Sequence, residues 1–308
     1  MEVYPAGYAK MRDFLRSIGV RQMLADQNHG TNIVTMLLRE PYDLIENHFY
    51  WAHPVMMKGW GLPAMVVNDS SISKGAGSLN GMFQTRAFGK PFCITEWDYT
   101  NTNRYNVEGA FLTGAYASLQ DWSALCRFAY SHNAKLFAKE ESRQEFFDIV
   151  NDPVRLLSER AGNLFFLRRD IRTSDRCVPL ILNRKHFENL ENSEECGIVP
   201  RRVGLVAKTG NVIFSPGKPP VLPAGTVAAI SADPIGQNLP LHVPVVRSTD
   251  HLNAFETLEK AGALPKNSYD PETGTFVSST GELTLRMNSN QFRAVSPRSE
   301  GFLLEPGQ

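Results

Sequence analysis

The sequence predicts an α/β fold in two parts: parallel strands joined by helices over residues 1–170, then an antiparallel β-sandwich over residues 171–308. Up to residue 170, helix-like and strand-like segments alternate without hairpin signals, which implies parallel pairing through helical crossovers. After residue 170, Pro and Gly become frequent between short runs of alternating hydrophobicity. Such a pattern is typical of antiparallel sandwiches.

The first segments read as helix, strand and helix. Residues 8–19 repeat apolar side chains every three or four positions and end at Gly19, so we expect a helix there. Residues 20–28 then read as a short strand. A second helix over residues 32–40 must end before Pro41, since the residue before a proline disfavours helical geometry.

The next segments supply two further strands. Residues 42–51 are apolar and aromatic enough for a strand, and residues 53–88 form a long loop rich in Gly, Ser and Asn. Residues 91–97 are apolar and partly β-branched, as a buried strand should be. A helix full of small residues follows over residues 107–121.

The first part closes with a strand over residues 124–132 and a helix over residues 152–170. Pro153 falls in the first turn of that helix, where its missing N–H costs nothing.

The second part contains short strand-like runs and one helical patch. The patch covers residues 250–262, with Asp250 as a plausible N-cap and Gly262 as a stop. The strand-like runs are residues 202–210, 211–215, 226–232, 282–287 and 291–296.

Composition excludes some classes of partner. Lys+Arg 32 balances Asp+Glu 32, so no global field attracts nucleic acid or an anionic membrane. No apolar run is long enough to span a bilayer. The first ten residues lack the basic and apolar regions of a signal peptide, so we expect secretion or periplasmic location only if a signal lies upstream.

The strongest candidate for chemistry is Glu96, which ends the strand over residues 91–97 beside three aromatic or acidic residues. Each predicted strand ends in polar or aromatic side chains, and the carboxyl ends of parallel strands meet at one edge. A carboxylate among aromatic rings suits attack on the anomeric carbon of a sugar. Taken alone, Glu96 could instead pair with a nearby base, Arg104 or Lys90.

The segments "ENHFYWAHP" and "KPFCITEWDYTNTNRYNVEGAFLTGAYASLQDWSALCRFAYSH" resemble the C-terminal half of a clan-A glycoside hydrolase, a cellulase-like (β/α)8 barrel. The resemblance covers about residues 8–170. The later run "ELTLRMNSNQFRAVSPRSEGFLL" is similar to the closing strands that such enzymes carry after the barrel. The resemblance implies barrel strands five to eight over residues 1–170 and a β-sandwich accessory domain over residues 171–308.

The resemblance also implies roles for individual residues. Glu96 matches the catalytic nucleophile at the end of the seventh strand, and His48 and Tyr50 match the H-x-Y of the sixth. In the family, that Tyr hydrogen-bonds the nucleophile and that His lies near the sugar being cleaved. The weaker candidates for binding carbohydrate are Trp51, His53, Trp97, Asn28, Tyr130 and His132.

The chain departs from the family in one essential respect. The acid/base Glu of the family ends the fourth strand, which should lie upstream of Met1. Neither Glu46 nor Asp26 is a convincing substitute. Because four βα units cannot close an eight-stranded barrel, we expect a fragment, a partner that supplies the other half-barrel, or a second copy of the chain.

Two competing functions remain from the sequence. The alternative to a retaining glycosidase is a non-catalytic carbohydrate-binding or scaffold protein derived from one. A metal-dependent barrel hydrolase is disfavoured, because the seven His lack H-x-H or H-E-x-x-H spacing and the four Cys form no C-x-x-C pair. We therefore expect no metal and no cofactor.

Overall fold

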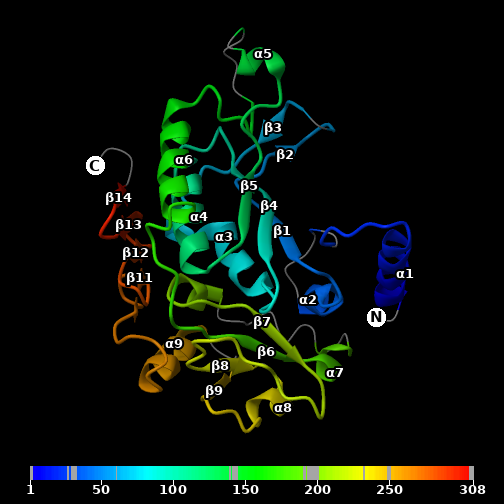
Figure 1. Ribbon diagram of the computed structural model, residues 1–308. Coiled ribbons are helices and arrows are strands. Elements are labelled where there is room, and N and C mark those ends of the chain that lie inside the picture. Colours follow the sequence, from blue (N-terminus) through cyan, green and yellow to red (C-terminus); the bar gives the residue numbers. More distant parts are fainter. Residues whose placement is uncertain are drawn as a thin grey trace.

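The protein is a mixed α/β structure with two parallel sheets, a larger antiparallel sheet and a two-stranded ribbon (Figure 1). The computed structural model describes residues 3–25, 28, 33–59, 61–138, 140, 145–189, 192, 201–231, 233–247 and 251–304. Within them, no helix is both long and apolar enough to cross a membrane.

The N-terminal parallel sheet carries the strand ends of interest. Its strands are β1 (Ile45–Trp51), β4 (Phe92–Tyr99) and β5 (Ala124–Arg127), in the order β1-β4-β5 and all parallel. The parallel pairing and three of the expected strands are thus confirmed. β5 is shorter than expected, because the chain leaves the sheet after Arg127 and the N–H of Ala129 donates to the carbonyl of Phe147 instead.

Helices α4 (Glu108–Leu119) and α6 (Pro153–Phe166) pack side by side against this sheet (Figure 1). Every residue of α4 is buried. The two helices approach closely through Gly114 and Gly162: a Cβ on Gly114 would lie 2.4 Å from the carbonyl oxygen of Gly162. Asp152 caps α6 by accepting from two backbone N–H groups, with Pro153 in the first turn as the sequence predicted.

The expected strand over residues 20–28 is wrong for the described residues 20–25, which form no strand. Residues 26 and 27, and with them the candidate Asp26, lie outside the described residues. Asp43 explains the irregular path: its carboxylate accepts from the N–H of Leu24, and its own N–H donates to the Leu24 carbonyl. The segment is thus tied to the start of β1 without a regular ladder. The helices on either side are as expected: α1 (Val3–Ser17) and α2 (Ile33–Arg39).

The stretch expected to be a long loop contains regular structure. After β1 come the antiparallel pair β2 (Val55–Met56) and β3 (Ala64–Met65) and then helix α3 (Gly77–Met82). Two 3₁₀ helices flank α3, namely η1 (Ile72–Lys74) and η2 (Phe83–Thr85). Leu79 and Phe83 are fully buried there, so this segment contributes to the core.

The antiparallel sandwich expected over residues 171–308 is wrong for the first half of that range. Four short strands there pair in parallel, in the order β7-β6-β8-β9. They are β6 (Leu180–Asn183), β7 (Asn211–Phe214), β8 (Ala229–Ser231) and β9 (Val245–Arg247). β6 is buried along its whole length, as central strands of parallel sheets are. Residues 202–210 hold the 3₁₀ helix η4 (Arg201–Leu205) rather than a strand.

Short helices connect these parallel strands, and a longer one follows them. They are α7 (Arg184–Phe187), α8 (Pro234–Gln237) and α9 (His251–Lys260). Helix α9 is the one that the sequence predicted.

Antiparallel pairing is confirmed in the last five strands, which follow one another in the sheet in chain order. They are β10 (Tyr269–Asp270), β11 (Thr275–Val277), β12 (Leu283–Arg286), β13 (Gln291–Val295) and β14 (Glu300–Leu303). This sheet packs on α4: the ring of Phe292 lies 5.9 Å from that of Phe111 and 5.6 Å from that of Tyr116.

One hydrophobic cluster runs through both halves of the chain. It extends from Leu37 to Ala294 and crosses residue 170 without a break. Polar contacts also cross: the side chain of Gln120 donates to the carbonyls of Gly204 and Ala207 and accepts from the N–H of Thr209.

Candidate functional site

Glu96 faces the same side of the sheet as His48 and Tyr50 because β4 contains one extra residue. Asn47 pairs with Ile94, but the next residue, His48, pairs with Glu96 and not with Thr95. Without this bulge, strict alternation would place Glu96 on the core side with Phe92 and Ile94. The bulge therefore turns the carboxylate out of the core, as bulges beside functional sites often do.

Tyr50 holds one oxygen of this carboxylate. Its hydroxyl donates a hydrogen bond to Oε1 of Glu96 from the neighbouring strand β1. Burial raises the pKa of Tyr50 strongly, and the hydrogen bond to Glu96 raises it further. The phenol therefore remains a hydrogen-bond donor over the whole physiological pH range.

His48 lies against the other oxygen of the carboxylate, with its Nδ1 3.6 Å from Oε2 of Glu96. On the far side of the ring, Nε2 lies 3.1 Å from the amide nitrogen of Asn28. With the amide donating to Nε2, the neutral imidazole carries its proton on Nδ1, facing Glu96. The side chains of His48 and Glu96 are 25% and 29% exposed, so both reach solvent.

Aromatic rings surround Tyr50 on its other sides. His53 packs edge-on at 5.2 Å, Phe147 at 5.2 Å and Phe128 at 6.4 Å between ring centroids. The ring of His53 also lies 5.5 Å from that of Phe147, and its Nδ1 is 2.9 Å from the Pro54 carbonyl oxygen. His53 was expected from the sequence, whereas Phe128 and Phe147 were not.

The two tryptophans expected to form subsite walls are placed differently. Trp97 is 2% exposed and stacks on Phe49 at 6.1 Å, so it belongs to the core. Alternation explains this, since the residue after the outward-facing Glu96 must face inward. Trp51 packs over Gly77, and its indole N–H donates to the Asp69 carbonyl at 2.8 Å, which ties it to the segment after β3.

The last two binding candidates follow β5. The side chain of Tyr130 is half exposed, with its ring 5.9 Å from that of Phe137. Nδ1 of His132 hydrogen-bonds to Asp148, whose carboxylate also accepts the backbone N–H of His132. Asp148 is buried.

A pocket of about 540 Å³ opens at the carboxyl ends of the three strands. Its walls come from the segments after β1, β4 and β5 and from residues 145–147, and they include Met56, Leu62, Phe128, His132, Phe146 and Phe147. Of the candidates named from sequence, His132 lines this pocket. For the wall formed by residues 145–147, the signal in the sequence was the acidic and aromatic run "EFFD" over residues 145–148.

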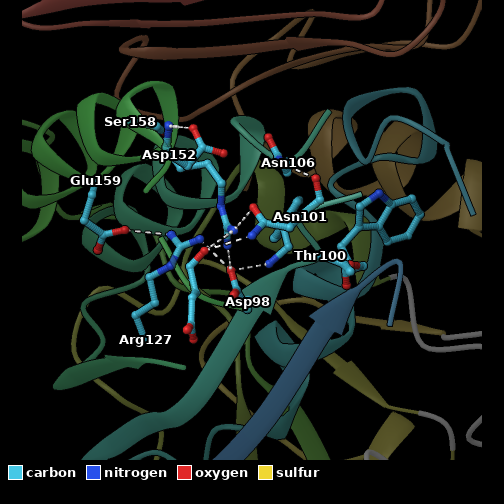
Figure 2. Close-up of polar contacts among 12 residues, drawn as sticks. Asp98, Thr100, Asn101, Asn106, Arg127, Asp152, Ser158 and Glu159 are labelled. Atoms are coloured by element: carbon cyan, nitrogen blue, oxygen red, sulfur yellow. Dashed lines mark hydrogen bonds and ion pairs between the residues drawn. The ribbon is translucent and has the colours of Figure 1, made fainter. Parts of the chain in front are cut away.

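A buried ion network, which was not expected from the sequence, supports the loops around this pocket. Asp98 is fully buried and accepts from Arg127 and from Arg155, each at 2.5 Å. Figure 2 shows the guanidinium of Arg127 between Asp98 and Glu159, to which it donates at 2.6 Å. Burial raises the pKa of Asp98, against the opposing pull of the two guanidinium groups.

The same network reaches the pocket. Arg155 also donates to the side-chain oxygen of Asn101, and Asn101 in turn donates to the backbone carbonyls of Glu145 and Asp148. Asn101 therefore links the strand-end network to the wall of the pocket.

The bases that could have neutralised Glu96 bind elsewhere. Nζ of Lys90 donates to the carbonyls of Glu40 and Tyr42. The guanidinium of Arg104 lies 5.3 Å from the ring of Tyr105. In the described part of the chain, no cluster of three or more His, Cys, Asp or Glu side chains has the arrangement of a metal site.

Neither a scan against protein-family models nor searches of curated proteins and of solved structures find a match to this chain.

Proposed function

We propose that the chain is the nucleophile-bearing part of a retaining β-glycoside hydrolase, with Glu96 as the nucleophile. The observation that carries this proposal is the pairing of Tyr50 and Glu96 across neighbouring parallel strands, in the carboxyl-terminal half of each. In parallel α/β folds, catalytic groups come from that end of the strands. His48 completes the arrangement on the other oxygen of the carboxylate.

The fold proposed with it is part of a (β/α)8 barrel, in which β1, β4 and β5 are strands six to eight. The described residues 20–25 and 28 would occupy the position of the fifth strand. Supporting this, Leu24 accepts from the N–H of Leu44 at 3.4 Å, and Asn28 contacts His48 at 3.1 Å. Both contacts join residues twenty positions apart, so Leu24 and Asn28 follow one another in the same direction as β1. Residues 171–308 would be an accessory part that covers α4.

The proposed chemistry begins with attack of the Glu96 carboxylate on the anomeric carbon of a β-linked sugar. The glycosidic C–O bond breaks, and the leaving oxygen takes a proton from a general acid. Water then hydrolyses the glycosyl ester on Glu96. Tyr50 fixes the orientation of the carboxylate through its hydrogen bond. The general acid is proposed to come from a missing half-barrel, supplied upstream, by a partner or by a second copy.

Mechanism-based labelling tests this proposal without the missing acid. A 2-deoxy-2-fluoro glycosyl fluoride has a leaving group that needs no protonation, so a competent nucleophile should trap it as a stable ester. We expect a panel with gluco, manno, galacto and xylo configuration to label the chain once, and peptide mapping to place the label on Glu96. Glu96→Gln should abolish labelling.

Labelling at another residue would overturn the assignment of the nucleophile. If no reagent of the panel labels the chain, the proposal of a hydrolase is rejected and the second candidate function remains.

The second candidate is a non-catalytic carbohydrate-binding protein that keeps the aromatic site. One observation favours it: aromatic rings of His53, Phe128 and Phe147 surround Tyr50, and such rings can bind a sugar without any general acid. Binding of an oligosaccharide with no labelling of Glu96 would support this alternative.

A further inference from the structure

The apolar pocket beside Tyr50 is a second candidate site, distinct from the Glu96 carboxylate. Phe147 and Phe128 separate the pocket from Tyr50, since each packs on the Tyr50 ring and also lines the pocket. The volume of about 540 Å³ is in the range of small-molecule sites. Its walls offer three phenylalanine rings and two aliphatic side chains but few polar atoms, so it suits a flat apolar ligand better than a sugar with many hydroxyls.

One polar group in this pocket is oriented by a buried partner. An ionised carboxylate accepts hydrogen bonds and donates none, so Asp148 fixes the proton of neutral His132 on Nδ1. Nε2 is then left with a free lone pair, and in the described residues no partner is recorded for it. The side chain is 41% exposed and lines the pocket. The ring of Phe128 supports it at 4.6 Å.

The negative charge near His132 favours a neutral ligand over an anionic one. The carboxylate of Asp148 lies behind His132, so an anionic ligand at Nε2 would face a group of like charge. A neutral hydroxyl would instead donate to the lone pair on Nε2. The ligand should therefore combine an aromatic ring with an un-ionised hydroxyl group.

We propose that this pocket binds a hydroxyaryl group, with the ring among Phe128, Phe146 and Phe147 and the phenolic hydroxyl donating to Nε2 of His132. Binding of a free phenol does not depend on glycoside hydrolysis. Joined to the proposed function, and resting on it, the same pocket would receive the aryl aglycone of a phenolic glycoside.

Binding of 2-naphthol, compared with 2-methoxynaphthalene, tests the proposal. The two rings are alike, but the methoxy compound has no hydroxyl proton to donate. By fluorescence titration of the full chain, we expect saturable binding of 2-naphthol and about tenfold weaker binding of the ether, the usual effect of one hydrogen bond. Glu96→Gln should leave both affinities unchanged, which separates this site from the proposed nucleophile.

Substitutions test which side chains contact the ligand. His132→Leu puts an apolar side chain in place of the imidazole and removes the acceptor, so it should weaken 2-naphthol binding about tenfold and leave binding of the ether unaffected. Phe147→Ala should weaken binding of both compounds. The exposed His242 provides the matched control, since His242→Leu should change neither affinity. Near-ultraviolet circular dichroism checks that each variant is folded.

Three outcomes would overturn the proposal: no saturable binding of 2-naphthol up to its solubility limit, equal affinity for the two compounds, or full affinity in folded His132→Leu. Asp148→Asn adds an independent measurement. An amide can donate to Nδ1 and so move the ring proton to Nε2, and we then expect the preference for 2-naphthol over the ether to fall.

Discussion

Nδ1 of His48 lies 3.6 Å from Oε2 of Glu96, while the hydroxyl of Tyr50 donates to Oε1 of the same carboxylate. Two side chains from one strand therefore face the two oxygens of a carboxylate on the next. The spacing of His48 and Tyr50, two residues apart on β1, places both on one face. The bulge in β4 brings Glu96 onto that same face.

Tyr50→Phe should slow labelling of Glu96 by the fluorosugar reagent. The substitution removes one hydrogen bond to a charged group and keeps the ring that packs on His53 and Phe147. Such a bond contributes about 1.5–3 kcal/mol, which corresponds to a roughly ten- to hundredfold slower labelling rate. The measurement is the rate of mass increase of the intact protein. An unchanged rate would mean that Tyr50 does not orient the nucleophile.

Turnover should depend steeply on the leaving group, because the proposed general acid is missing from the described site. A 2,4-dinitrophenyl β-glycoside needs no protonation of its leaving oxygen, whereas an alkyl glycoside loses about a hundred- to ten-thousandfold without a general acid. Release of dinitrophenolate by the isolated chain, with little or no cleavage of the methyl glycoside, is the expected result. Efficient hydrolysis of both substrates by this chain alone would show that an acid is already present.

Asp98→Asn should destabilise the fold by about 3–5 kcal/mol, because it removes the buried counter-charge of Arg155 and leaves Arg127 with Glu159 alone. Equilibrium unfolding in urea measures the change. Asp13→Asn is the control: its pair with Arg12 is exposed, and such pairs contribute at most about 1 kcal/mol. Equal small losses in the two variants would contradict a structural role for the buried network.

The sequence predicted elements where one local pattern dominates. The strands around His48 and Glu96 and the helix beginning at Pro153 were recognisable because each has a hydrophobic period or a capping signal of its own. The contact between Tyr50 and Glu96 was predicted from their places near the ends of two strands and from the resemblance to glycoside hydrolases.

What the sequence could not predict depends on contacts distant along the chain. The bulge before Glu96 is a matter of register between two strands, and no local pattern marks it. The parallel pairing of β6 to β9 was missed because a short buried run between prolines and glycines looks the same in either kind of sheet. The His132–Asp148 pair requires the chain to fold back after β5, which the backbone bond from Ala129 to Phe147 achieves.

Tyr50, Tyr99 and Tyr116 should resist ionisation in the folded protein. Burial raises the pKa of each of the three, and the bond to Glu96 adds to the effect at Tyr50. Since the folded-state pKa lies above the unfolded value of about 10, the folded state keeps these protons longer. Their stabilising effect is complete below about pH 10 and is lost as the pH rises further.

Alkaline difference absorbance at 295 nm measures the ionisation of these tyrosines. Tyr50→Phe should leave the absorbance change of the folded protein unaltered and lower that of the unfolded protein by one tyrosine. A folded-state decrease in Tyr50→Phe would contradict the burial and hydrogen bonding of that phenol.

Gly162→Ala should destabilise the packing of α4 on α6. A Cβ at this position would lie 2.4 Å from the carbonyl oxygen of Ala110, and the clash is with backbone, which cannot rotate away. We expect the free energy of unfolding to fall by about 1–3 kcal/mol, the range for overpacked cores, measured by urea unfolding.

The control is Gly81→Ala in α3, where nothing lies within 4 Å of the new Cβ. There alanine should be neutral or stabilising by about 0.5–1 kcal/mol, because it lowers the entropy lost on forming a helix. A stable Gly162→Ala variant would mean that the two helices can separate at no cost, contrary to their close backbone approach.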